Sequence, residues 1–128
     1  MDAYRWTNRP LLVFAPSRKH PFFAAQQESL NGHAQALRER EVVVVKISGD
    51  QVLVDGEPAQ DLHADKLRQR YVMDRNEAAV LLVGKDGGLK VKKPDVFLAG
   101  ELFETIDAMP MRLQEMRDRD GMTAPKSR

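Results

Sequence analysis

The sequence predicts an α/β domain whose mixed sheet is covered by helices on both faces. Residues 11–15 and 42–45 are runs of consecutive apolar residues, a pattern typical of strands that are buried on both sides. Between these runs, apolar residues recur at helical spacing over residues 23–37. A strand, a helix and a second strand in this order predict a βαβ unit with parallel strands and a right-handed crossover. The 128 residues are enough for one such domain.

Charge and composition exclude several classes of function. Lys and Arg number 20 against 19 Asp and Glu, a net charge of +1, so we expect no nucleic-acid partner. The sequence contains no Cys, which excludes thiol catalysis, disulfides, thiolate zinc sites and iron–sulfur clusters within this chain. The apolar runs are too short for membrane insertion. The three His residues have no ligand partner at helical spacing, so we expect no metal and no cofactor.

The first strand is expected to run directly into a long helix. Residues 16–20 form the corner between the two, and Pro21 suits the first helical position, where its missing N–H is not needed. The apolar spacing predicts a helix of about five turns. Asn31-Gly32 is its weak point, because a glycine inside a helix is destabilising, and a break is expected there.

The second strand is the clearest in the chain, because residues 42–45 are four consecutive valines. A turn follows it, and residues 52–54 are expected to fold back as a short hairpin arm. We expect residues 55–61 to form a loop. A second helix should then run from about Asp61 or Ala64 to Tyr71.

A β-hairpin and a final helix complete the predicted domain. Residues 79–83 are a third buried strand, and the turn over residues 85–88 leads to an edge strand protected by lysines. A final helix should carry an apolar stripe formed by Leu98, Leu102, Phe103, Ile106 and Met109. Pro110 should stop or kink this helix, with one or two further helical turns after it. We expect a single domain over residues 1–119 and a disordered tail over residues 120–128.

Three sequence blocks resemble a known family. They are Trp-Thr-Asn-Arg-Pro-Leu-Leu-Val-Phe-Ala-Pro-Ser at residues 6–17, Val-Leu-Leu-Val-Gly-Lys-Asp-Gly-Gly at 80–88 and Ile-Asp-Ala-Met-Pro-Met-Arg at 106–112. With them, the chain resembles a thioredoxin-like domain family of unassigned function, found in mostly secreted bacterial proteins and in vertebrate extracellular matrix and sushi-repeat proteins. The resemblance implies a thioredoxin-like fold with a four-stranded mixed sheet, in the order βαβ, helix, β-hairpin, helix.

The N-terminal sequence bears on the expected location. It has no signal peptide as written. The resemblance favours a periplasmic or extracellular location if Met1 is not the natural start, and a cytoplasmic one is expected otherwise.

The corner between the first strand and the first helix is the first candidate site. Ser17, Arg18, Lys19 and His20 stand where thioredoxins have Cys-x-x-Cys, and residues 76–78 lack the proline that thioredoxins place before the third strand. Thiol redox chemistry is therefore excluded. An enzyme, hydrolytic or peroxiredoxin-like, would use Ser17 with His20 as its base. Otherwise Ser17 caps the helix, or the basic helix start binds a small anion.

The second candidate site lies near the C-terminal end of the predicted domain. Met109, Met111, Arg112 and Met116 form a candidate partner surface, because methionine adapts to irregular shapes. The same residues also suit a kinked helix packed on the sheet. The sequence therefore predicts a non-catalytic thioredoxin-like binding or interaction module for a protein or a small anionic ligand. An enzyme acting at the corner is the alternative, and a third is a structural domain that acts through residues 111–119 in an oligomer contact. No particular oligomeric state is predicted.

Overall fold

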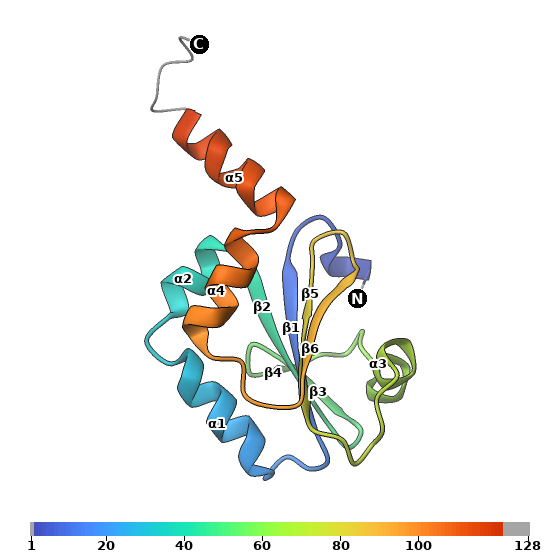
Figure 1. Cartoon of the computed structure of the whole chain (residues 1–128). Helices are drawn as coiled ribbons and strands as arrows, with labels where there is room; N and C mark the ends of the chain where they lie inside the picture. Colours follow the sequence, from blue (N-terminus) through green and yellow to red (C-terminus); the bar gives the residue numbers. More distant parts are fainter. Residues whose placement is uncertain (1, 122–128) are drawn as a thin grey trace.

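The computed structural model describes residues 2–121, which form a six-stranded mixed sheet with helices on both faces (Figure 1). The strands are β1 (Arg9–Ala15), β2 (Val42–Ser48), β3 (Gln51–Val54), β4 (Glu57–Pro58), β5 (Ala79–Val83) and β6 (Leu89–Lys93). The helices are the short 3-10 helix η1 (Asp2–Tyr4), α1 (Pro21–Leu30), α2 (Ala34–Glu39), α3 (Ala64–Tyr71), α4 (Ala99–Asp107) and α5 (Pro110–Gly121). Across the sheet the strand order is β4-β3-β2-β1-β5-β6.

The centre of the sheet confirms the predicted βαβ unit and hairpin. β1 pairs with β2 in parallel, with Leu11 opposite Val44. β1 pairs with β5 antiparallel, with Leu12 opposite Leu81, and β5 and β6 form the expected antiparallel hairpin. All seven residues of β1 are buried, as its continuous apolar run predicts.

The prediction of four strands is wrong, because β3 and β4 extend the sheet beyond β2. β3 is the expected hairpin arm and pairs antiparallel with β2. β4 lies in the segment expected to be a loop; it has two residues, and it pairs Pro58 with Leu53 and Glu57 with Val54. A two-residue strand containing a proline carries no hydrophobic period, so no sequence pattern predicts it.

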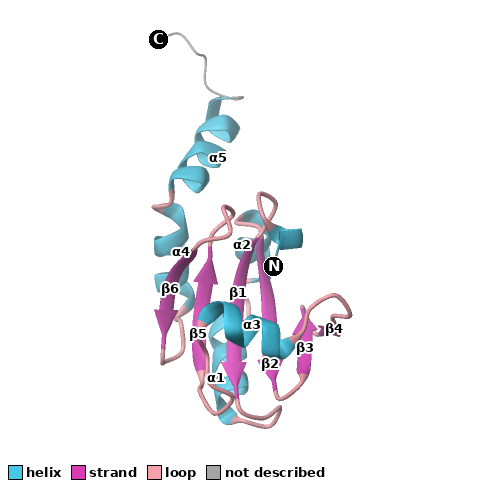
Figure 2. Ribbon diagram, turned by 90° about the vertical axis from the view of Figure 1, so that its right-hand side faces the viewer, coloured by secondary structure: helices cyan, strands magenta, loops and turns pink. Residues whose placement is uncertain are grey.

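Helices cover both faces of the sheet, as expected (Figure 2). Successive side chains of β1 point to opposite faces. One face packs against α3 and includes Leu12, Phe14, Val45, Ile47, Leu67 and Tyr71. The other packs against α1 and α4 and includes Leu11, Leu30, Val80, Leu82, Leu102 and Ile106.

The helix boundaries mostly agree with the sequence. α1 starts at Pro21 and ends at Leu30, and Gly32, with a φ of +82°, separates it from α2, so the expected break is confirmed. α4 ends before Pro110, which starts α5 as its first residue.

Two expectations for the C-terminal helices are wrong. Leu98 precedes α4 and is 60% exposed, so it does not belong to the inward stripe. α5 has 12 residues, more than the one or two turns expected. Residues 122–128 of the expected tail lie outside the described residues. Within residues 2–121, no helix is both long and apolar enough to cross a membrane.

Candidate functional site

The corner after β1 is held by a histidine cap. His20 precedes α1, and its Nδ1 accepts a hydrogen bond from the Phe22 amide at 3.2 Å. The expectation that Ser17 caps the helix is therefore wrong, because His20 takes that place. Since Nδ1 is an acceptor, a neutral His20 carries its proton on Nε2. Ser17, Arg18 and Lys19 are exposed, and His20 is half-buried.

The corner lacks the contacts that a serine nucleophile needs. Such a nucleophile needs a base within hydrogen-bond reach and a third group that orients the base. Within residues 2–121, no side-chain hydrogen bond joins Ser17 to His20, and no carboxylate is paired with His20. The Nδ1 atom of His20 is occupied by a backbone amide.

Arg18 also lines a hollow beside the corner. This hollow, of about 340 Å³, is bounded by side chains from the corner, α1, β2 and β3, and we call it the cationic hollow. Its lining includes Arg18, Phe23, Lys46, Ser48, Gln51 and Leu53. Lys46 and Ser48 alternate in β2 with the residues that face α3, so they lie on the face that carries α1.

The cationic hollow has positive charge and no negative counterpart. Arg18 and Lys46 have no ion pair among the described residues, and no carboxylate lines the hollow. The Ser48 hydroxyl and the Gln51 amide add neutral donors. Cationic side chains with neighbouring neutral donors suit a carboxylate, sulfate or phosphate group, because charge-assisted hydrogen bonds are the strong ones.

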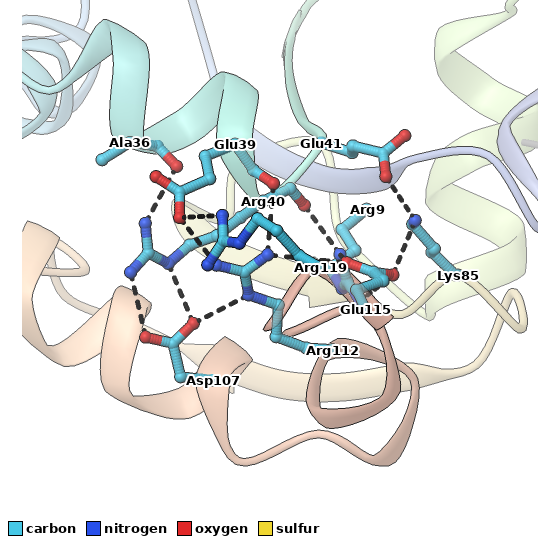
Figure 3. Close-up of polar contacts among 10 residues, drawn as sticks. All are labelled: Arg9, Ala36, Glu39, Arg40, Glu41, Lys85, Asp107, Arg112, Glu115 and Arg119. Atoms are coloured by element: carbon cyan, nitrogen blue, oxygen red, sulfur yellow. Dashed lines mark hydrogen bonds and ion pairs between the residues drawn. The ribbon is translucent and has the colours of Figure 1, made fainter. Parts of the chain in front are cut away.

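The opposite end of the sheet carries charges that are paired with one another (Figure 3). We call this group the ionic cluster; it consists of Arg9, Glu39, Arg40, Glu41, Lys85, Asp107, Arg112, Glu115 and Arg119. Arg9 donates to both carboxylate oxygens of Glu115, at 3.3 and 2.9 Å. Lys85 Nζ lies 2.7 Å from Glu115 Oε2 and 2.7 Å from Glu41 Oε1. Arg9 and Lys85 are buried, so these carboxylates neutralise charge that water does not reach.

The second half of the ionic cluster joins α2, α4 and α5. Asp107 accepts two hydrogen bonds from Arg40, at 3.0 and 2.9 Å, and one from Arg112 at 3.1 Å. Glu39 accepts from Arg112 at 3.2 Å and from Arg119 at 2.8 Å. Together with Glu115, these contacts fasten α5 to the domain.

The ion pairs determine the pKa of two cluster carboxyls. Burial would raise the pKa of Asp107, but hydrogen bonds from Arg40 and Arg112 hold that pKa below its usual value. Burial acts in the same direction on Glu115, and hydrogen bonds from Arg9 and Lys85 lower its pKa overall. Both groups are therefore ionised at neutral pH and act as counter-ions.

The four residues of the predicted partner surface do not lie together on one exposed face. Arg112 is 3% exposed and belongs to the ionic cluster. Met109 is half-buried and packs on the core near α4, and Met116 is half-buried on α5. Met111 remains exposed, at 37%. Arg112 pairs with Asp107 and Glu115, which are close in sequence, and with Glu39, which is 73 positions away and gives no local signal.

The strand order, the hairpin and the helices on both faces define a domain of the thioredoxin-like class. The chain is similar to thioredoxin peroxidase I of Plasmodium yoelii, with a TM-score of 0.57 and 14% identity, over 100% of this chain and 84% of that one. At this identity the similarity shows the fold alone.

The family is shown by the sequence itself. Residues 1–115 match the family described as a domain of unknown function, DUF4174, and the chain belongs to that family. Coiled-coil domain-containing protein 80 of Danio rerio is 26% identical over 145 aligned positions, which cover 98% of this chain and 17% of that protein. The chain thus spans about a sixth of the length of this relative. The occurrence of the family in secreted and sushi-repeat proteins stays a prediction.

Proposed function

We propose that this chain is a non-catalytic binding module of thioredoxin-like fold and that the cationic hollow is its ligand site. One observation carries the proposal: Arg18 and Lys46 come from separate elements and line the same hollow, which has no carboxylate in its lining. The ligand group is an anion with several oxygen acceptors, such as a carboxylate, a phosphate or a sulfate.

The surroundings of Lys46 support this proposal. Lys46 is half-buried in the middle of a sheet, and charged groups removed from water are normally paired. Elsewhere in the described chain, Lys85, Lys90 and Lys92 each have a carboxylate partner. An anion in the cationic hollow would give Lys46 the partner that the fold supplies to these other lysines.

The alternative of an enzyme at the corner has less support. Peroxiredoxin-like chemistry needs a thiolate, and the chain has no Cys. Hydrolysis would need Ser17 to be activated by His20, and the described contacts of His20 lead to the backbone. Esterase activity that is present in the wild type and lost in Ser17→Ala would favour the enzyme over the binding module.

Anion titration tests the proposal. Phosphate, sulfate and acetate are added to isotope-labelled protein, and the amide shifts of residues 16–22 and 46–51 are followed by NMR. We expect saturable shifts at millimolar concentrations. We also expect affinity about tenfold weaker in Arg18→Gln and in Lys46→Gln, because a hydrogen bond to a charged group contributes about 1.5 kcal/mol.

Lys66→Gln is the matched control, because Lys66 is an exposed lysine on α3 and lies on the other face of the sheet. Its anion affinity should equal that of the wild type. If the wild type and the three variants have equal anion affinities, or if no amide shift is saturable, the cationic hollow is not the ligand site.

A further inference from the structure

A second hollow adjoins the cationic hollow on the same face of the sheet. It has a volume of about 330 Å³ and lies between α1, α2 and the start of the β3–β4 hairpin. Lys46 and Gly56 line both hollows, so the two lie next to each other. We call the combined feature the edge groove.

The two parts of the edge groove differ in chemistry. The cationic hollow provides Arg18 and Lys46. The second hollow is lined by the apolar side chains of Leu30, Leu37 and Val44 and by the methyl group of Ala34. A bound molecule that covered both parts would place an anionic group near Lys46 and apolar groups near α2.

From this juxtaposition we infer that the edge groove binds an extended protein segment with acidic residues at one end and apolar residues at the other. The inference rests on the proposed anion site and names the class of ligand that carries the anion. In an extended segment, alternate side chains point in opposite directions, so every second residue faces the groove. Acidic residues followed by apolar ones therefore meet the two parts of the groove in turn.

The polar lining favours a peptide over a fatty acid. Side-chain amides of Gln27, Asn31 and Gln51 occur along the groove among the apolar residues. Gln27 Nε2 donates to Asn31 Oδ1 at 3.2 Å, which leaves the Gln27 oxygen, the Asn31 nitrogen and the Gln51 amide for a ligand. An acyl chain cannot hydrogen-bond to these amides, whereas a peptide backbone has a donor and an acceptor at nearly every residue. The positive charge of the groove favours a negatively charged segment, because Lys46 and Arg18, which have no ion pair among the described residues, attract acidic residues and repel basic ones.

One charged group in the edge groove is already occupied. Asp55 lines the second hollow, and its Oδ1 accepts a hydrogen bond from the Val44 amide at 3.1 Å. Lys46 lines the same hollow as Asp55, but no ion pair joins the two among the described residues, and Arg18 lines only the cationic hollow. The positive part of the groove therefore keeps its charge for a ligand.

The test compares four probes on the full chain. Three are blocked hexapeptides: one with three Glu followed by three Leu, one with three Glu followed by three Ser, and one with three Lys followed by three Leu. The fourth probe is octanoate, and inorganic phosphate serves as the reference for the cationic hollow. We expect the Glu/Leu peptide to bind about tenfold more tightly than the Glu/Ser peptide, because its leucines bury apolar surface.

Ala34→Glu is the variant that separates the two parts of the edge groove. Ala34 is exposed at the start of α2, so a glutamate there fills the second hollow without disturbing the core. We expect it to weaken the Glu/Leu peptide about tenfold and to leave phosphate affinity within about twofold. Gln35→Glu is the matched control, because it adds the same charge one residue later and outside the groove lining; peptide affinity should be unchanged.

The remaining outcomes overturn specific parts of the inference. If phosphate binds but both acidic peptides bind equally tightly, the proposal that the edge groove binds a protein segment is wrong, and the proposed anion site stands. If octanoate binds as tightly as the Glu/Leu peptide, the ligand is an amphiphile and not a protein segment. Equal binding of the Lys/Leu peptide would overturn the charge argument, and absence of binding by every probe would overturn the proposed function as well.

Discussion

The two ends of the sheet use the same kinds of side chain in different ways. In the ionic cluster, Arg9 and Lys85 are buried, and each meets the carboxylate of Glu115. In the cationic hollow, Arg18 and Lys46 meet no carboxylate among the described residues. In the cluster, carboxylates neutralise the buried cations, and Arg9 Nε is the one cluster atom that is buried without a hydrogen-bond partner among the described residues, so we expect the cluster to serve stability. The cations of the hollow have no counter-ion among residues 2–121, which makes the hollow the better candidate for binding.

The largest change in the free energy of unfolding is expected when the central counter-ion of the ionic cluster is removed. Glu115→Gln leaves Arg9 and Lys85 buried with less compensating charge, and we expect a loss of about 3 kcal/mol in the free energy of unfolding. Urea denaturation measures this loss. Glu104→Gln, on the exposed surface of α4, is the control and should change stability by less than about 0.5 kcal/mol. A loss of less than about 1 kcal/mol in Glu115→Gln would show that the cluster is not a stability element.

The second-largest effect is expected from acid, which should weaken the ion pairs of the ionic cluster. The folded-state pKa of Glu115 and of Asp107 lies below the ordinary values of 4.5 and 3.8. The unfolded chain therefore binds more protons than the folded chain at acidic pH, and stability decreases as the pH falls below these ordinary values. Denaturation at pH 7, 5, 4 and 3 measures the decline. Glu115→Gln should decline less steeply than the wild type, and parallel curves would contradict the assignment.

Anion binding should stabilise the protein by a smaller amount. At tenfold excess over its dissociation constant, phosphate should raise the free energy of unfolding by about 1.4 kcal/mol. The gain should persist in Glu115→Gln and vanish in the double variant Arg18→Gln, Lys46→Gln, because the two ends of the sheet act independently. Stabilisation that depended on Glu115 instead would place the anion at the ionic cluster.

The smallest effect is expected from removing a charge of the hollow without a ligand. Lys46→Met keeps the unbranched, apolar part of the side chain and removes a cation that has no ion pair among the described residues. We expect the free energy of unfolding to change by less than about 0.5 kcal/mol, and phosphate affinity to fall. Urea denaturation and phosphate titration of one sample measure both. A large loss of stability would mean that Lys46 has a structural role.

Much of the fold was predictable because its central strands carry a local signal. Residues 11–15, 42–45 and 79–83 are apolar runs, and their burial follows from hydrophobicity alone. Gly32 marks the helix break for an equally local reason, since it adopts a positive φ. β4 was missed because its pairing with β3 depends on the hairpin and not on side-chain pattern.

The candidate sites were predictable only in part. The corner was found because Ser17 and His20 directly precede a helix, but nothing in the sequence decides which of them caps it. Lys46 interrupts an otherwise apolar strand, which is the one signal that could have extended the corner site to β2. The ionic cluster was missed because its members are far apart in the chain: Arg9 and Glu115 are separated by 106 positions.

The attachment of α5 has a consequence for the motions of the protein. α5 extends away from the sheet in Figure 1, and its contacts with the domain include the ion pairs of Arg112, Glu115 and Arg119. Its Met111 and Leu113 stay 37% and 40% exposed, so little apolar surface holds it in place. Salt screens exposed charges but leaves apolar burial intact. Arg119 and Glu39 form the exposed pair, whereas the pairs of Arg112 and of Arg9 with Glu115 are largely buried. Rising ionic strength should therefore let the C-terminal turn of α5 exchange its amide hydrogens first, while the start of α5 and the strands remain protected.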